Sequence, residues 1–475
     1  MTNKEIKTQV VVLGGGPGGY SAAFRAADLG KQVTLIEQEQ NLGGVCLNVG
    51  CIPSKALLHA AYILDAAKQY SAHGITFDTP KIDLDKLRAS KEGIIKRLAM
   101  GIKGLARQRK VGLVTGAGKF ISSNQIEVPG VAGETTLISF ENAIIAAGSM
   151  PAELPFIPKD PRVMNSTGAL NLPEIPEQML IIGGGIIGLE MATVYSSLGS
   201  KVTVVELMDQ LIPGMDADII EPFKQYNANK IHKILLSTKV TKVEAKEDGL
   251  WVTFAGKNAP AQSGKFNRIL VAVGRKPNGK LIAADKAGVE VDQKGFVLVN
   301  QKMQTSAPHI FAIGDIIGNP MLAHKAVAEG RYAAEIIANL KPEFHIKNIP
   351  NVAYTDPEIA TVGLTETEAK QQNIPYAKGV FPWLASGRSL SLGRKEGITK
   401  LLFDPPSKKI IGGSIVGPNA GELIAEIALA ISLGATAEKI AHVIHPHPTL
   451  SETVMMACET FLGTITDLYL PKNNF

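Results

Sequence analysis

A glycine-rich turn that occurs twice constrains the fold of this 475-residue chain more than any other feature. The apolar, β-branched run 8–13 ends in GGGPGG at 14–19, and a small-residue stretch and a second apolar run then lead to Glu37. The same order returns with GGGIIG at 183–188 and ends at Glu206, and in both copies the first glycine and the acid are 23 residues apart. One such motif is weak evidence, whereas two copies in a strand–turn–helix–strand–acid frame predict two dinucleotide-binding units.

Each position in this frame has a physical reason. The first glycine permits a tight turn, the second lets a phosphate approach the backbone, and the third lets helix and strand pack closely. The pyrophosphate then meets free N–H groups at the positive end of the helix dipole. Glu37 and Glu206 would each accept a hydrogen bond from a ribose hydroxyl. Glu206 would also repel a 2′-phosphate, and residues 207–210 include no arginine, so the second unit favours NAD over NADP. A purely structural turn is the alternative for either loop.

Length and charge limit the classes of protein to which the chain can belong. At 475 residues it exceeds what one hydrophobic core supports, so several domains are expected. The net charge, 49 − 44 = +5, is spread along the chain and argues against nucleic acid or a membrane as partner. The first residues carry no signal or transit pattern, and no apolar run approaches the roughly 20 residues that span a bilayer. We therefore expect a cytoplasmic protein.

The remaining pattern predicts a third, separate domain. Buried-type strands at 141–148 and 268–274 close the two units, and a polar stretch with two prolines, 341–350, is the clearest linker. Further strands are predicted at 305–315, 352–363, 397–403 and 410–416, and helices at 81–109, 323–340, 420–433 and 437–443. The expected fold class is α/β, with two Rossmann-like dinucleotide-binding domains and a C-terminal α+β domain.

Cys46 and Cys51 lie in GGVCLNVGCIPSK at 43–55, directly after the first glycine turn. A close pair in a chain with three cysteines indicates redox catalysis or metal binding rather than a disulfide scaffold. Zinc needs two more ligands, and Cys458 stands alone, so redox chemistry is favoured over a metal site or an inert pair. Helical geometry would point the two side chains about 140° apart, so a disulfide needs an irregular turn. Lys55 either favours a thiolate or contacts a cofactor, or is simply solvated.

Two of the nine histidines, His445 and His447, occur in IHPHPTLSE at 444–452. The prolines hold the backbone extended, so the two imidazoles point to opposite sides and cannot both serve one site. Glu452 could orient one of them as carboxylates do in acid–base pairs, and a histidine near a dithiol can carry its protons. Such a histidine by itself would be assigned a structural role. The presence of the thiol pair elsewhere in the chain is the reason to consider a catalytic one.

Together these motifs resemble the pyridine nucleotide–disulfide oxidoreductases. The resemblance rests on the cysteine motif, both glycine turns, FAIGD at 311–315 and HPHPTLSE at 445–452, in the family's order, and it covers Val10 to about Pro471. It implies an FAD-binding domain in two parts, an NAD-binding domain between them, and a C-terminal dimerisation domain. The two parts of the FAD-binding domain would be 1–148 and 276–346. The NAD-binding domain would be 149–275, and the dimerisation domain 347–475.

The resemblance also implies a role for each candidate residue. FAD would be held by Gly14, Gly16, Gly19, Glu37, Lys55, Gly118, Asp315 and the segment around Ala323. NAD would be held by Gly183, Gly185, Gly188, Glu206 and Gly274, and Glu190 would pair with Lys55. Cys46 would exchange disulfides with the substrate and Cys51 would face the flavin. His447, oriented by Glu452, would be the acid–base catalyst, reaching in from the other subunit of a homodimer; Pro446 replaces the small residue that relatives often have there.

Within the family, the chain is most similar to the members that reoxidise protein-bound dihydrolipoamide with NAD⁺. The implied partners are lipoyl domains of the acyltransferase (E2) component of 2-oxo acid dehydrogenase complexes, or the glycine cleavage H protein. Glutathione- or trypanothione-type reductases use NADPH, which Glu206 disfavours. Mercuric and large thioredoxin reductases add a C-terminal cysteine pair that the tail lacks, and soluble transhydrogenases lack the thiol pair. A non-catalytic flavoprotein subunit is the remaining alternative.

Overall fold

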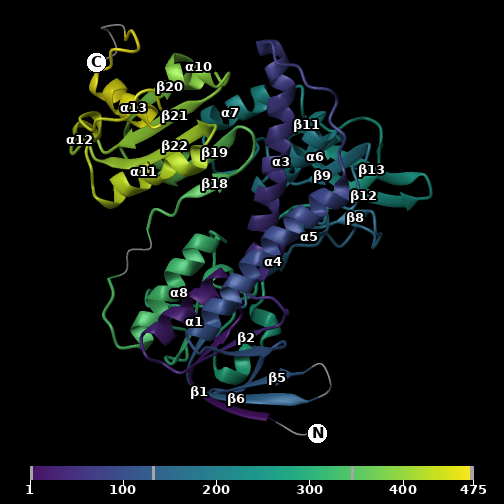
Figure 1. Cartoon of the computed structure of the whole chain (residues 1–475), viewed down its shortest axis with the longest axis vertical. Helices are drawn as coiled ribbons and strands as arrows, with labels where there is room; N and C mark the ends of the chain where they lie inside the picture. The colour runs from purple at the N-terminus through teal and green to yellow at the C-terminus, as the bar shows by residue number, and fades with distance from the viewer. Residues whose placement is uncertain (1–3, 131–133, 344–346, 471–475) are drawn as a thin grey trace.

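The computed structural model describes residues 4–130, 134–343 and 347–470 and divides into three lobes (Figure 1). The first unit holds α1 and α8, the second unit holds α6, and the C-terminal domain holds α11 and α13. Residues 341–343 and 347–350 form no helix or strand, as expected of a linker, and 344–346 lie outside the described residues. The expected division into two α/β units and an α+β domain is confirmed.

The first unit is built on a seven-stranded sheet in the order β3-β2-β1-β6-β5-β4, with β17 beside β6. Its strands are β1 (Lys4–Leu13), β2 (Val33–Glu37), β3 (Gly112–Thr115), β4 (Lys119–Ser122), β5 (Gln125–Pro129), β6 (Thr135–Ile145) and β17 (Ile310–Ala312). The helices α1 (Pro17–Asp28) and α8 (Ala323–Ile337) pack against each other. Because β17 and α8 come from beyond the second unit, the first unit is discontinuous in sequence. The expected strand 305–315 is shorter than predicted and ends before Asp315.

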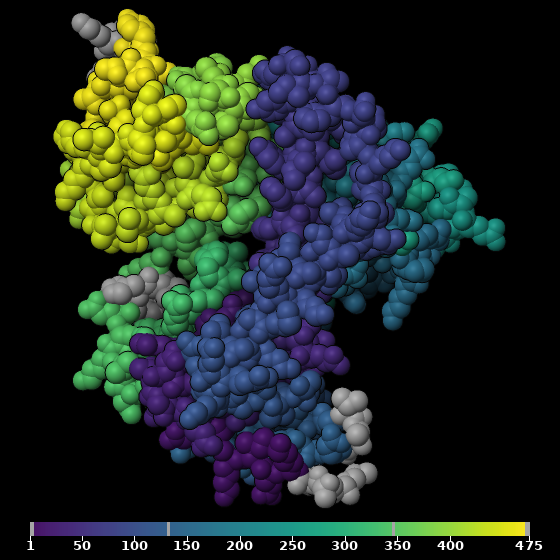
Figure 2. Space-filling view, viewed as in Figure 1, coloured from purple at the N-terminus to yellow at the C-terminus, as the bar shows by residue number. Residues whose placement is uncertain are grey.

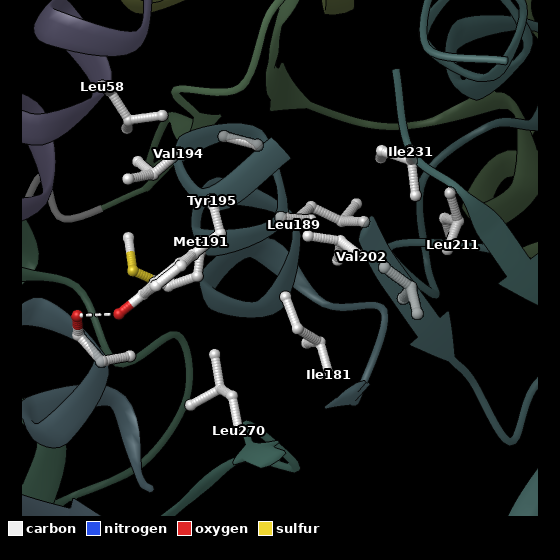
Figure 3. Packing of buried hydrophobic residues seen from close by; sticks show 14 of the residues in the cluster. Leu58, Ile181, Leu189, Met191, Val194, Tyr195, Val202, Leu211, Ile231 and Leu270 are labelled. Atoms are coloured by element: carbon white, nitrogen blue, oxygen red, sulfur yellow. Dashed lines mark hydrogen bonds between the residues drawn. The ribbon is translucent and has the colours of Figure 1, made fainter. Parts of the chain in front are cut away.

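The second unit repeats the parallel arrangement on a five-stranded sheet, β11-β10-β9-β15-β8. Its strands are β8 (Val163–Met164), β9 (Gln178–Ile182), β10 (Lys201–Val205), β11 (Lys233–Leu235) and β15 (Arg268–Val271), and an antiparallel sheet of β12 (Thr238–Lys246), β13 (Gly249–Gly256) and β14 (Gly264–Phe266) adjoins it. The helices are α5 (Ser166–Leu170), α6 (Ile186–Leu198) and α7 (Ala217–Tyr226). Figure 3 shows the core around α6, where the Tyr195 hydroxyl donates to the Ala169 carbonyl at 2.8 Å. The hydroxyl, which is the one polar atom of this buried side chain, is therefore hydrogen-bonded.

The C-terminal domain is an antiparallel sheet, β18-β19-β22-β21-β20, covered by helices. Its strands are β18 (Asn351–Ala353), β19 (Glu358–Gly363), β20 (Ala377–Pro382), β21 (Ile398–Phe403) and β22 (Ile410–Gly417). Its helices are α9 (Glu366–Gln372), α10 (Gly387–Ser391), α11 (Ala420–Ser432), α12 (Ala437–Ala441) and α13 (Glu452–Leu462). The prediction of one strand over 352–363 is wrong, because Pro357 lacks the N–H that a continuous ladder needs.

Three helices run between these lobes: α2 (Gly44–Val49), α3 (Cys51–Tyr70) and α4 (Leu84–Gln108). Figure 2 shows α3 and α4 crossing the visible face of the molecule. The expected helix at 81–109 is present as α4. By length and composition alone, the stretch 44–73 is the one helical segment among the described residues that is long and apolar enough to cross a membrane. Leu57 and Leu58 of α3 lie in the hydrophobic core that includes α6. Packing in this core accounts for the apolar residues of the helix as well as a membrane would.

Candidate active site

The two glycine turns have nearly the same geometry. Gly14 and Gly183 have φ values of +111° and +113°, in a region that glycine adopts without strain. A Cβ added to Gly19 would lie 1.8 Å from the Gly14 carbonyl oxygen. The corresponding distance between Gly188 and the Gly183 oxygen is 2.0 Å. The third glycine of each turn is therefore required for helix and turn to pack.

The second glycine of each turn faces open space instead. A Cβ on Gly185 would meet no atom within 4 Å, and one on Gly16 would meet Gly44 Cα at 3.9 Å. Gly16 and Gly185 are the N-caps of α1 and α6, and no side chain caps either helix among the described residues. Their first N–H groups can therefore bind an anion, and the space beside them fits a pyrophosphate in both units.

Glu37 and Glu206 occupy equivalent positions behind these turns. Glu37 Oε2 accepts the Gly15 N–H at 2.8 Å, and Glu206 Oε2 accepts the Gly184 N–H at 2.7 Å. The other oxygen of each carboxylate accepts the amide two residues further along the chain, at 3.1 and 2.8 Å. Burial raises the pKa of Glu37, although these amide hydrogen bonds oppose the shift. The acids thus buttress the turns while lying at the carboxyl ends of β2 and β10, where a ribose is expected.

Ser149, Arg275 and Asp315 form a polar cluster between the two units. Asp315 accepts a hydrogen bond from the Ser149 hydroxyl at 2.5 Å. Arg275 donates to both the hydroxyl and the carbonyl oxygen of Ser149, in each case at 2.7 Å. Burial lowers the pKa of Arg275, while Asp315 opposes the shift. The predicted residue Asp315 is therefore held in place, and Ser149 and Arg275 are additional residues that sequence reasoning missed.

The other predicted glycines and Ala323 lie next to the ends of strands and helices. A Cβ on Gly118 would lie 2.8 Å from the Leu13 side chain at the end of β1. Gly274 has a φ of +116° and immediately precedes Arg275. Ala323 is the first residue of α8. Gly118 and Gly274 therefore lie at strand ends, and Ala323 lies at the start of a helix.

Cys46 and Cys51 are brought together by a break between two helices. Cys46 lies in α2, Cys51 begins α3, and Gly50 separates them. A Cβ on Gly50 would lie 2.8 Å from the Val45 carbonyl oxygen, so the break depends on glycine. The two Sγ atoms are 2.6 Å apart, and both cysteines are free thiols in this structure. The irregular turn that the sequence requires for a disulfide is present.

The two thiols differ in acidity. The hydrogen bond from Cys46 lowers the pKa of Cys51 to about 7, burial opposes this shift, and Lys55 adds to it. The same hydrogen bond, together with burial, raises the pKa of Cys46. Near neutral pH, Cys51 is therefore the thiol of this pair that ionises first.

Lys55 forms the expected ion pair with Glu190 of α6. The Lys55 Nζ atom lies 2.9 Å from Glu190 Oε1 and 3.1 Å from Oε2. Lys55 lies inside α3, which begins at Cys51 because Pro53 is tolerated in a first helical turn. Tyr354 completes the group, and nothing in the sequence links it to Lys55. The pair therefore joins the thiol-bearing helix to the second unit.

The two histidines have different surroundings. His447 Nδ1 lies 2.9 Å from Glu452 Oε1, and its side chain is 77% exposed. His445 Nε2 lies 2.8 Å from Glu426 Oε1, and its side chain is only 5% exposed. Within the described residues, no hydrogen bond joins His447 to either cysteine. His447 is thus oriented and accessible, whereas His445 is engaged within its own domain.

Asp216, Asp218 and Glu366 form an acidic group with a geometry that could hold a metal ion. The Lys400 ammonium already lies among them, with Nζ 2.8 Å from Asp216, 2.6 Å from Asp218 and 3.2 Å from Glu366. The side chain of Lys400 is 1% exposed. A lysine ammonium therefore occupies the centre of the group, which joins α7 of the second unit to the C-terminal domain.

Comparison with known proteins agrees with this geometry. The family described as pyridine nucleotide-disulphide oxidoreductase matches residues 8–330, and its dimerisation domain matches residues 349–458. The chain belongs to this family. It is therefore a flavoprotein disulfide oxidoreductase that uses FAD and NAD(H), and the two open glycine turns fit these cofactors.

The relatives and solved structures are similar over almost their whole length. Proteins named dihydrolipoyl dehydrogenase are 57% identical in Vibrio cholerae, with 98% of each chain covered, and 54% identical in Haemophilus influenzae, with 98% of this chain and 97% of the relative covered. The crystal structure of LpdA from Mycobacterium tuberculosis has a TM-score of 0.88 at 25% identity, covering 95% of this chain and 99% of that one. The HOCl-induced flavoprotein disulfide reductase RclA from Escherichia coli has a TM-score of 0.84 at 25% identity, covering 94% of this chain and 98% of that one.

Proposed function

We propose that this chain oxidises protein-bound dihydrolipoyl groups to lipoyl groups and transfers the electrons to NAD⁺. The observation that carries the proposal is the Cys46–Cys51 pair, with its Sγ atoms 2.6 Å apart and unequal acidities, directly after the first dinucleotide turn. Similarity to proteins named dihydrolipoyl dehydrogenase, at 57% identity over 467 residues, supports this substrate. Glu206 and the absence of arginine from 207–210 support NAD over NADP.

The unequal acidities assign a different role to each cysteine. In the oxidised enzyme, a dihydrolipoyl thiolate attacks Cys46 Sγ, a new S–S bond forms, and the Cys46–Cys51 bond breaks. Cys51 leaves as the thiolate, since a pKa of about 7 makes it the better leaving group. The second dihydrolipoyl thiol then displaces Cys46, which closes the lipoyl disulfide and leaves the enzyme as a dithiol.

His447 and Glu452 handle the two protons of this exchange. The proton of the first substrate thiol passes to His447 Nε2, and that of the second ends on Cys46. Glu452, at 2.9 Å from Nδ1, fixes the ring and stabilises its protonated form. No hydrogen bond joins His447 to a cysteine of its own chain among the described residues, and we therefore assign its action to the thiols of the other subunit. The match to a dimerisation domain over 349–458 supports that homodimer.

The first glycine turn, Glu37, Asp315 and α8 would hold FAD, and when bound this cofactor would supply the redox chemistry that links the dithiol to NAD⁺ in the second unit. The chain's own residues prepare this transfer. Lys55 lowers the pKa of Cys51 and so favours the thiolate, while Glu190 fixes Lys55 from the second unit. The break at Gly50 places both sulfur atoms at the start of α3.

The implied partners are carrier proteins with a lipoyl group. Lipoyl domains of 2-oxo acid dehydrogenase complexes and the glycine cleavage carrier present the same dithiol, so the same site would serve either. The cytoplasmic location of the protein stays a prediction from its sequence.

Steady-state turnover with two substrate pairs tests the proposal. Dihydrolipoamide with NAD⁺ should be turned over at least about 100-fold faster, as kcat/KM, than glutathione disulfide with NADPH. Faster turnover of the second pair would show a glutathione-reductase-like enzyme and refute the proposal. Cys46→Ser and Cys51→Ser should each abolish dihydrolipoamide turnover, because each removes one sulfur of the exchanging bond.

A further inference from the structure

Tyr354 contacts both members of the Lys55–Glu190 ion pair. It follows β18 in the C-terminal domain, whereas Lys55 belongs to α3 and Glu190 to the second unit. The Lys55 Nζ atom lies 4.4 Å from the centre of the Tyr354 ring. The Tyr354 backbone N–H donates to Glu190 Oε1 at 3.1 Å. Three separate parts of the chain therefore meet at one ammonium group.

The position of this ammonium affects the redox thiol. Lys55 lowers the pKa of Cys51, Glu190 raises it, and the hydrogen bond from Cys46 is the largest influence. Tyr354 and Arg275 are the other titratable groups that interact with Cys51, and Glu358 also interacts with Lys55. Lys55, which stabilises the Cys51 thiolate, is paired with Glu190, which destabilises it. The net effect of the two charges on the thiolate therefore depends on where the Lys55 side chain is held.

An aromatic face is suited to hold a lysine in this way. The ring attracts the cation without neutralising it, unlike a second carboxylate, and it displaces water from one side of the ammonium. The Lys55 side chain is 35% exposed, so without the ring it has room to turn toward solvent. Glu190, at 5% exposure, is fixed by its burial and by the Tyr354 N–H.

The Tyr354 backbone is anchored independently of its ring. The Asp356 carbonyl accepts the Asn227 side-chain amide at 2.7 Å, and the Asp356 carboxylate pairs with Arg394 at 2.5 Å. The Thr355 hydroxyl donates to the Pro357 carbonyl at 2.7 Å. A substitution of the Tyr354 side chain therefore leaves the loop and its N–H in place, so the effect of the ring can be measured separately.

We propose that Tyr354 is a positioning residue, whose ring holds the Lys55 ammonium on the face of α3 that carries Cys51, one helical turn away. The inference rests on the proposed role of Cys51 as the thiol that ionises. It assigns the C-terminal domain a function within its own subunit, distinct from that of His447, which acts on the thiols of the partner. Docking of this domain completes the electrostatic environment of the redox helix.

The test compares Tyr354→Leu with Tyr354→Phe in the FAD-loaded dimer. The pH midpoint of the long-wavelength thiolate–flavin absorption is measured in the dithiol form. Tyr354→Leu should raise the midpoint by about 0.5 to 1 unit, since the ring–ammonium contact is lost, whereas Tyr354→Phe should keep it within about 0.2 unit. Equal shifts in both variants, or no shift in Tyr354→Leu, would overturn the inference.

A second measurement covers the case in which a variant binds FAD poorly. The rate at which iodoacetamide alkylates Cys51 is followed against pH by mass spectrometry of the Cys51 peptide, and its midpoint should shift in the same direction. In a Lys55→Met background, Tyr354→Leu should add no further shift, because the ring then has no ammonium to hold. An added shift of the full size would refute the mechanism. Neither readout involves a lipoyl substrate, so failure here is distinguishable from failure of the proposed function.

Discussion

His447 Nδ1 lies 2.9 Å from Glu452 Oε1, while the rest of the imidazole is open to solvent, with 77% of the side chain exposed. Glu452 is itself fixed, because its Oε2 accepts the Thr449 N–H at 2.6 Å. A buried carboxylate that holds one nitrogen of an accessible imidazole leaves the other nitrogen for proton transfer. The relationship distinguishes His447 from His445, whose ring is buried against Glu426.

Replacing His447 should therefore remove proton transfer and little else. His447→Gln should lower kcat for dihydrolipoamide by about 10²- to 10⁴-fold, the usual contribution of a positioned acid–base group. Reduction of the flavin by NADH should be retained, since that step does not use this imidazole. His445→Gln is the matched control and should keep most of the activity; an equal loss in the control would reverse the assignment.

The thiolate of Cys51 should titrate near neutral pH. Its pKa is lowered to about 7, so the thiolate is present above this value and is protonated as the pH falls through it. In the dithiol enzyme the long-wavelength absorption should be strong at about pH 8 and weak at about pH 6. Cys51→Ser should abolish the band and Cys46→Ser should retain it. A band that survives in Cys51→Ser would show that the other sulfur faces the flavin.

Features encoded by local sequence were predictable before the structure. The glycine frames could be recognised because Gly14, Gly19 and their counterparts satisfy backbone requirements that no other residue meets. The irregular turn between the cysteines was expected on the condition that they form a disulfide, since i and i+5 positions diverge on one helix.

Features that depend on docking between distant segments were not predictable. Tyr354 is an ordinary aromatic residue at the end of a strand, and its contact with Lys55 arises only when the C-terminal domain meets α3. The Lys55–Glu190 pair was expected from family resemblance and not from spacing. Ser149 and Arg275 were likewise missed, because each is a common residue whose role depends on the junction between the two units.

Two glycines of the second turn should respond differently to alanine. A Cβ on Gly188 would lie 2.0 Å from the Gly183 carbonyl oxygen, so Gly188→Ala should destabilise the protein by about 1–3 kcal/mol or more. A Cβ on Gly185 would meet no atom within 4 Å, so Gly185→Ala should fold normally. It should instead weaken NADH binding by about tenfold or more, because the methyl group occupies the pyrophosphate space. Thermal unfolding and NADH titration distinguish the two effects. Unchanged NADH affinity in Gly185→Ala would place the pyrophosphate elsewhere.

Lys400 should be essential for the junction between the second unit and the C-terminal domain. Its ammonium pairs with Asp216 and Glu366 and is almost completely buried, so Lys400→Met would leave these two carboxylates without the cation between them. We expect a loss of about 3–5 kcal/mol in the free energy of unfolding, measured by denaturant titration at about pH 7. Lys378→Met is the control, because that side chain is 48% exposed and its contact with Glu366 should contribute less than about 1 kcal/mol.

The same cluster predicts a loss of stability in acid. Hydrogen bonds and charges from Tyr376, Lys378 and Lys400 hold the pKa of Glu366 at about 2, against burial, and the pKa of Asp216 is also lowered. A carboxylate with a lowered pKa in the folded state stabilises it above the unfolded value and loses this effect as the pH falls toward the folded value. Stability of the wild-type protein should therefore decline between about pH 4.5 and 2. In Lys400→Met the decline should be smaller, because protonation then relieves repulsion between the carboxylates; an equal or steeper decline would show that Lys400 does not control them.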